Sequence, residues 1–317
     1  MSALPYIDFD EVHARAPWLT LIDALEAAHR REKPKTGQLR LWQSRDDGQP
    51  DFMTLAPAWE KDEALGVKLV TSFPKNMERH GVSTVGSIYI IFDPATGKPQ
   101  TLIDGEALIF RKTAADTALG IRLLARPDAK KLVMMGAGAL APYVIEAALA
   151  VCPGIDEVQV WNRTMEKADA LASGLSGRGL PVVPCTDVAA AHAGADIILA
   201  ATMAEEPIIR GDMLKPGTHV GLIGSFRPEM REGDDTLLTR AKLYVDDPSA
   251  IEKSGDFTRA IEAGVITRED VLGDLYDLCQ GRCALPGPDD ISMFKNAGAS
   301  QLDLMTARVI TAHAIEG

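Results

Sequence analysis

Short apolar runs alternate with helical patterns through the middle of the chain. The run over 131–135 is followed by a glycine turn and then by an alanine-rich stretch, 139–151, that favours a helix. A second apolar run, 158–161, precedes a helical pattern over 165–175. Strand, helix and strand at this spacing are typical of a βαβ unit, in which the two strands are parallel.

The same alternation continues towards residue 290. Further apolar runs lie at 182–183, 197–201, 219–223 and 243–245, with a helical pattern over 187–193. Six short apolar strands running in one direction predict a doubly wound, Rossmann-like parallel sheet. We place this dinucleotide-binding domain at residues 119–290.

The first 115 residues show a different pattern. Runs at 66–70, 87–92 and 101–103 predict strands, and the segment 93–97 (DPATG) is typical of a hairpin turn between two of them. A helical pattern over 113–125 leads into the central domain, and an amphipathic helical pattern over 291–315 returns from it. We therefore expect an α/β protein whose Rossmann-like domain is inserted in an α+β substrate domain, residues 1–118 plus 291–317.

Composition narrows the classes of partner. The 317 residues carry a net charge of −12, which gives no general field for a nucleic acid backbone. The chain start lacks a basic segment followed by an apolar run, and no apolar stretch reaches the ~18 residues of a membrane span. The four cysteines lack metal-site spacing. We expect a cytoplasmic protein with free thiols, no metal, no nucleic acid partner and no membrane association.

The glycine turn carries the clearest chemical signal. Its sequence fits G-x-G-x-x-A directly after a strand and at the start of a helix: Gly136, Ala137, Gly138, Ala139, Leu140 and Ala141. The first glycine permits the tight turn, the second lets the backbone approach a pyrophosphate, and the helix N-terminus offers N–H groups to it. The motif predicts a dinucleotide site; the alternative is a turn selected for packing alone.

The end of the second strand bears on the choice of dinucleotide. NAD sites usually place an acid there, whereas this chain has Asn162, Arg163 and Thr164. No carboxylate repels a 2′-phosphate, and a guanidinium can bind one. NADP(H) is therefore preferred, and NAD(H) remains possible. The alternative for Arg163 is that it merely lies on a solvated turn. We also expect Thr202, which follows the strand ending at Ala201, to contact the cofactor.

Several segments together carry a family resemblance. They are 66–76 (GVKLVTSFPKN), 92–97 (FDPATG), 112–115 (KTAA), 161–164 (WNRT), 224–228 (GSFRP) and 294–298 (FKNAG). In order and spacing the chain resembles the ornithine cyclodeaminase and mu-crystallin family over nearly its whole length. The resemblance implies a homodimer whose first domain supplies the substrate pocket and the dimer interface. It also adds Ser225 to the cofactor-binding residues.

The resemblance further implies a group of residues that binds a substrate carboxylate. The matching positions are Arg40, Lys68, Thr84 and Lys112, with Lys68 also as the catalytic residue. Lys112 stands where the family usually has arginine, and lysine loses the planar two-pronged fit. Without the resemblance, Arg40 and Lys112 could each be ordinary surface residues, as most lysines and arginines are. Lys68 differs because it lies in an apolar run, where a charge needs a partner such as a substrate carboxylate. We expect His80 in a loop and Asp303 on a helix surface.

One loop position separates the reactions of the family. Its cyclodeaminases carry an aspartate in a G-x-D-x-P loop, where this chain has Phe226. Phenylalanine cannot transfer protons, so the resemblance favours NADPH-dependent reduction of an imine next to a carboxylate, such as pyrroline-2-carboxylate or piperideine-2-carboxylate, to an L-amino acid. The alternatives are an ornithine cyclodeaminase or hydroxyproline dehydratase-type lyase, an alanine dehydrogenase-type oxidoreductase, and a non-catalytic NADPH- and ligand-binding protein like mu-crystallin.

Overall fold

The computed structural model describes residues 4–45 and 50–312. The chain divides into two compact units: Met1–Lys112 with Ala299–Gly317, and Thr113–Gly298. These limits differ from the expected 118/119 and 290/291. The first difference arises because a single helix, α4 (Gly105–Leu124), crosses the division, and the second because a strand, β15 (Ile291–Lys295), belongs to the parallel sheet. No described helix is long and apolar enough to cross a membrane.

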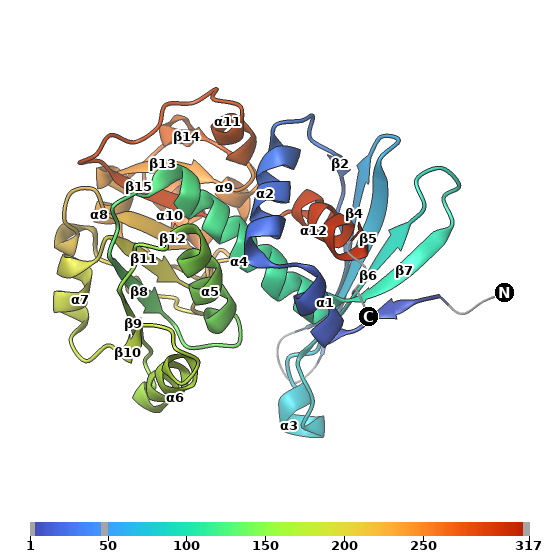
Figure 1. The fold of residues 1–317 in the computed structure, drawn as a ribbon, viewed down its shortest axis with the longest axis horizontal. Coiled ribbons are helices and arrows are strands. Elements are labelled where there is room, and N and C mark those ends of the chain that lie inside the picture. Colours follow the sequence, from blue (N-terminus) through green and yellow to red (C-terminus); the bar gives the residue numbers. More distant parts are fainter. Residues whose placement is uncertain (1–3, 46–49, 313–317) are drawn as a thin grey trace. The chain divides into compact units, whose positions relative to one another are not determined.

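The second unit is built on an eight-stranded parallel sheet, with helices on both of its faces (Figure 1). Its strand order is β10-β9-β8-β11-β12-β15-β13-β14. The strands are β8 (Lys131–Met135), β9 (Glu157–Trp161), β10 (Val182–Pro184), β11 (Ile197–Ala200), β12 (His219–Leu222), β13 (Ala241–Val245), β14 (Val271–Gly273) and β15. The α/β class and the six predicted strands are confirmed, whereas β14 and β15 were missed.

The helices of this unit precede the first strand, β8, or lie between later strands along the chain. They are the second part of α4, α5 (Ala141–Val151), α6 (Met165–Ser176), α7 (Val188–Gly194), α8 (Asp235–Arg240), α9 (Ala250–Lys253), α10 (Gly255–Glu262) and α11 (Leu275–Cys279). The central strands are apolar at nearly every position because both faces are covered; Ile198, Val220 and Met293 are fully buried in one cluster.

The first unit is a seven-stranded sheet, ordered β1-β7-β6-β5-β4-β2 with β3 also paired to β4. The strands are β1 (Tyr6–Ile7), β2 (Lys35–Thr36), β3 (Leu39–Gln43), β4 (Asp51–Glu60), β5 (Ala64–Ser72), β6 (Val85–Phe92) and β7 (Pro99–Asp104). All pairs are antiparallel except β1 with β7. The predicted turn after β6 is present, and its Gly97 N–H donates to the Asp93 carbonyl.

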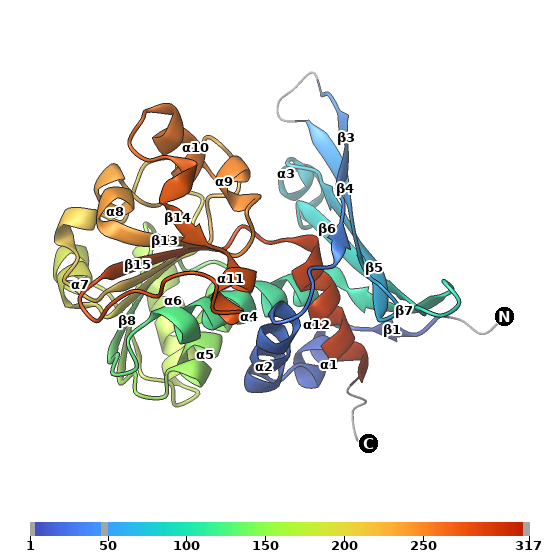
Figure 2. The same cartoon turned by 90° about the horizontal axis from the view of Figure 1, so that it is seen from above.

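A C-terminal helix, α12 (Ser300–Ala312), packs against β4 and β5 on one face of this sheet (Figure 2). The remaining helices are α1 (Phe9–Arg15), α2 (Trp18–His29), α3 (Asn76–His80) and the beginning of α4. The helical pattern expected over 291–315 is wrong for its first five residues, which form β15, and residues 313–315 lie outside the described residues.

Candidate functional site

The glycine turn at the end of β8 has the geometry of a dinucleotide cradle. Gly136 has a φ of +109°, and a Cβ there would lie 2.7 Å from the Ala201 carbonyl oxygen, so only glycine fits. A Cβ on Gly138 would meet no atom within 4 Å, which leaves its outer side open. Helix α5 then begins without a side-chain cap on its first turn. The open side of Gly138 and the uncapped first turn of α5 therefore fit a bound pyrophosphate.

The end of β9 contributes Asn162, which is hydrogen-bonded to the glycine turn, and the exposed cation of Arg163. The Asn162 side-chain oxygen accepts from the Ala137 N–H at 3.2 Å, and its amide donates to the Thr164 carbonyl. Asn162 thus ties the end of β9 to the glycine turn. Arg163 and Thr164 are exposed, and within residues 4–45 and 50–312 no ion pair holds the Arg163 guanidinium. Its charge is available to an anion.

Thr202 and Ser225 direct their hydroxyl groups into the protein. The Thr202 hydroxyl donates to the Glu232 carboxylate at 2.9 Å. The Ser225 side chain is fully buried, and its hydroxyl donates to the Met230 carbonyl at 2.7 Å. Both residues lie in loops at the carboxyl edge of the sheet, but their hydroxyls hold those loops. The Glu232 partner was missed because, in the sequence, it belongs to a charged run (REGDD) typical of a solvated loop.

In the first unit, Lys68 has a partner from the same chain. Its Nζ lies 2.7 Å from Oδ2 of Asp303, joining β5 to α12. The Asp303 side chain is 1% exposed and that of Lys68 is 16% exposed. The expectation of Asp303 on a helix surface is therefore wrong, because α12 is covered on nearly all sides. The partner that the apolar context of Lys68 required is a carboxylate of the protein itself.

Tyr89 extends this cluster. It pairs with Lys68 in the β5–β6 register, so both side chains lie on the same face of the sheet. The ring is fully buried, and within the described part of the chain its hydroxyl has no hydrogen-bond partner. Burial, and then the charge of Asp303, raise the pKa of Tyr89 well above its usual value. Gly66 leaves the space for this ring, since a Cβ there would lie 2.3 Å from the hydroxyl oxygen.

The other predicted substrate residues lie on separate elements. Arg40, on β3, donates from Nε to the Thr54 hydroxyl at 2.9 Å, and its guanidinium lies over the Phe52 ring. Lys112, on α4, is 5% exposed. Thr84 is half-buried just before β6. The expectation of His80 in a loop is wrong, because His80 is the last residue of the short helix α3, where it is exposed. These contacts join Lys68 to Asp303 and Arg40 to Thr54; they do not join the four predicted residues to one another.

The second unit has a doubly wound parallel sheet with an open glycine turn, and the first unit is a mostly antiparallel α+β unit. Together they define the class: a protein with a dinucleotide-binding fold and a separate α+β unit. Residues 8–317 match the Ornithine cyclodeaminase/mu-crystallin family, and the chain belongs to this family. The sequence resemblance is thereby confirmed.

Three relatives match most of the chain. It is 38% identical over 312 residues to a Delta(1)-pyrroline-2-carboxylate reductase of Paracoccus denitrificans, covering 98% of this chain and 96% of that protein. It is 34% identical to the ketimine reductase mu-crystallin of Mus musculus, over 82% of this chain and 79% of that protein. The structure of Thermococcus litoralis Delta(1)-pyrroline-2-carboxylate reductase in complex with NADH and L-proline matches with a TM-score of 0.89 and 26% identity, over 99% and 98% of the chains.

Proposed function

We propose that this protein is an NADPH-dependent imine reductase that converts a cyclic imine next to a carboxylate, pyrroline-2-carboxylate or piperideine-2-carboxylate, to the L-amino acid. The observation that carries the proposal is the full-length similarity to a pyrroline-2-carboxylate reductase. The half-exposed Phe226 in the loop after β12 agrees with it, because this side chain offers no group for the proton transfers of ammonia loss.

The second unit binds the cofactor in this proposal. When bound, the reduced nicotinamide supplies the hydride for the imine carbon. The glycine turn and the start of α5 receive the pyrophosphate, and Arg163 pairs with the 2′-phosphate of NADPH. The absence of an acid at the end of β9 supports NADPH over NADH, since nothing there repels the phosphate.

The first unit binds the substrate. Asp303 balances the charge of Lys68, so this pair carries no net charge. The attraction for the substrate carboxylate then falls to Arg40 and Lys112, while Lys68 donates a hydrogen bond, and in the reaction a proton, to the imine nitrogen. Holding the substrate in one orientation accounts for most of the acceleration in such a reaction.

Following NADPH absorbance with each cyclic imine tests the proposal. Loss of NADPH with either imine is expected, with NADH slower and with no ammonia or proline formed from ornithine. Proline from ornithine without imine reduction would make the protein a cyclodeaminase. NADPH binding without turnover of either imine would refute the reductase and favour a carrier.

We further propose that the protein is a homodimer in the cytoplasm, formed through the sheet of the first unit. Strand β3 is exposed along its whole length, and Leu39, Leu41 and Trp42 on it are each more than half exposed. Apolar surface of this kind commonly marks a protein interface. A second copy would cover it. Light scattering should give twice the chain mass for the wild type and one chain mass for L41K; a monomeric wild type would refute the dimer.

A further inference from the structure

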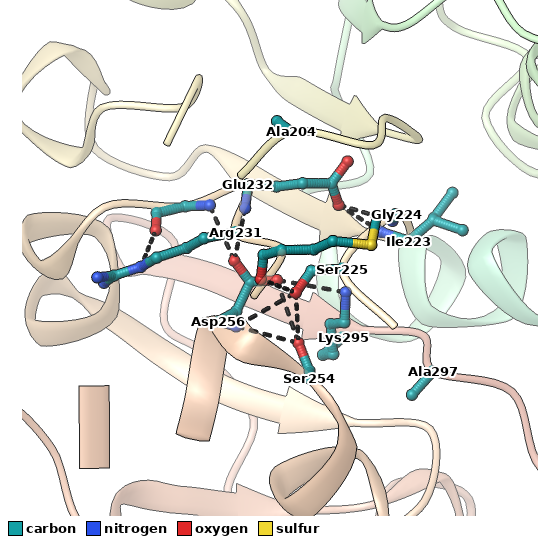
Figure 3. A network of polar contacts seen from close by, with 12 residues as sticks. Ala204, Ile223, Gly224, Ser225, Arg231, Glu232, Ser254, Asp256, Lys295 and Ala297 are labelled. Atoms are coloured by element: carbon teal, nitrogen blue, oxygen red, sulfur yellow. Dashed lines mark hydrogen bonds and ion pairs between the residues drawn. The ribbon is translucent and has the colours of Figure 1, made fainter. Parts of the chain in front are cut away.

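Glu232 is a buried acid that joins two loops at the carboxyl edge of the parallel sheet (Figure 3). Its Oε1 accepts from the backbone N–H and the hydroxyl of Thr202, at 2.7 and 2.9 Å. Its Oε2 accepts from the backbone N–H groups of Ile223 and Gly224, at 3.1 and 2.7 Å. Thr202 follows β11 and Gly224 follows β12, so each oxygen holds one loop.

These two loops also touch each other and the glycine turn. A Cβ on Gly224 would lie 1.9 Å from the Thr202 carbonyl oxygen, so the loops are in backbone contact. A Cβ on Gly136 would lie 2.7 Å from the Ala201 carbonyl oxygen and 3.1 Å from Cγ2 of Thr202. The loop after β11 therefore lies directly beside the glycine turn of the cofactor motif.

A second layer holds Glu232 itself. Oδ1 of Asp256 accepts from the backbone N–H groups of Glu232 and Gly233, at 2.8 and 3.0 Å. Oδ2 of Asp256 lies 3.3 Å from Nζ of Lys295, and both side chains are fully buried (Figure 3). Burial raises the pKa of Glu232, the Lys295 charge lowers it and the Asp256 charge raises it further. Only an ionised carboxylate can accept all four of the hydrogen bonds that Glu232 receives.

The strand order gives these loops a place along the cofactor. Strand β8, which carries the glycine turn, has β9 on one side and β11 followed by β12 on the other. In a doubly wound sheet the pyrophosphate lies at the glycine turn and the adenosine ribose at the end of the second strand, here β9. The nicotinamide half then lies over the loops that Glu232 joins. This placement rests on the dinucleotide site proposed above.

We propose that Glu232 is a positioning residue for the nicotinamide half of the cofactor. It holds the loops after β11 and β12 in the conformation that receives the ring, and makes no contact with the adenosine half. In E232Q the amide oxygen can still accept from one loop, but the amide nitrogen faces the N–H donors of the other, which lose their acceptor.

Two ligands distinguish this role from general support of the fold. The dissociation constants of NADPH and of 2′-phospho-ADP-ribose, which lacks the nicotinamide ring, are measured by calorimetry on the purified full-length protein. We expect E232Q to weaken NADPH binding about tenfold or more and to leave the fragment within about twofold of the wild type. Equal weakening of both ligands, or of neither, would overturn the proposal.

Two further variants keep the test decisive. D196N makes the same chemical change at the opposite edge of the sheet, where Oδ2 of Asp196 accepts from the N–H groups of Lys130 and Lys131. It should change neither dissociation constant. If E232Q does not fold, T202V removes the hydroxyl that donates to Glu232 and accepts from the Ala204 N–H, and leaves the backbone bond of Thr202 to Glu232 in place. It should weaken NADPH alone, about threefold; unchanged NADPH binding in T202V would overturn the proposal. A wild type that binds neither ligand would refute the proposed function itself.

Discussion

We predict that removing Lys68 and removing Asp303 from their ion pair lower the stability of the protein by different amounts. Replacing one partner of a buried pair leaves an unpaired charge, at a cost of about 3–5 kcal/mol. K68M leaves a carboxylate that is 1% exposed, so we expect the full cost. D303N leaves an ammonium that is 16% exposed and able to reach water, so we expect a smaller cost, about 1–3 kcal/mol. The double variant should be more stable than K68M alone.

Thermal unfolding measures these costs. With a shift of about 2–4 °C for each kcal/mol, K68M should lower the Tm by about 10 °C and D303N by about 5 °C. The coupling in the double-mutant cycle should reach about 1–3 kcal/mol. A double variant whose loss equals the sum of the single losses would show that the two side chains do not interact, and D303N losing more than K68M would contradict the reasoning from exposure.

Variants of Lys68 also distinguish its contribution to stability from its contribution to catalysis. If Lys68 donates the proton, K68M should lower kcat/KM for the cyclic imine by about 10²–10⁴-fold. K68R keeps the ion pair but gives up protons poorly, so its Tm should stay near that of the wild type while its kcat falls. A K68R enzyme with full kcat would remove the proton-donor role and leave Lys68 as a binding residue.

Three further predictions concern the second unit. G138A has open space for its Cβ, so we expect an unchanged Tm and NADPH binding weakened about tenfold. G136A should weaken NADPH binding and also lower the Tm, because of its φ of +109° and the close Ala201 carbonyl. Equal Tm values for the two variants would contradict this reasoning. R163A should raise the KM for NADPH about 10–100-fold and leave that for NADH within about twofold, and equal changes would argue against a 2′-phosphate contact. Burial lowers the pKa of His219 to about 3, so below pH 6.5 the unfolded chain takes up a proton that the folded protein does not. This contribution is fully present above pH 6.5 and is lost towards pH 3 at about 1.4 kcal/mol per pH unit, so the stability advantage of the wild type over H219N should narrow between pH 7 and 5.

The strands and the glycine turn could be predicted because their signals are local. Gly136 is required by its own backbone angle, and the strand before it is apolar because both faces of its sheet are covered. Strand β15 could not be separated in the same way. Its five residues run through 296–299 into the amphipathic pattern of α12, and a short apolar run does not distinguish strand from helix. Only its pairing with β12 and β13 decides the matter.

The acids that complete the two candidate sites could not be predicted, although the residues they hold could. The apolar surroundings of Lys68 predict that its charge has a partner, but the sequence does not say which of the 45 acidic residues is that partner. Asp303 looked like a surface acid because a helix usually has a solvated side. In α12 every residue from Gln301 to Ala307 is buried, so that expectation does not apply.

Glu232 and Asp303 follow one physical rule. A carboxylate is stable inside a protein only where several donors or a cation converge on it, because burial otherwise disfavours its charge. Donors converge where segments distant in sequence meet: Glu232 receives them from the ends of β11 and β12, and Asp303 meets the lysine of β5 from α12. Strand ends and the faces of a sheet are also where cofactor and substrate groups must be held still. A buried acid whose donors come from segments distant in sequence is therefore a stronger indication of a functional position than its place in the sequence, and both acids gain these donors only from the fold.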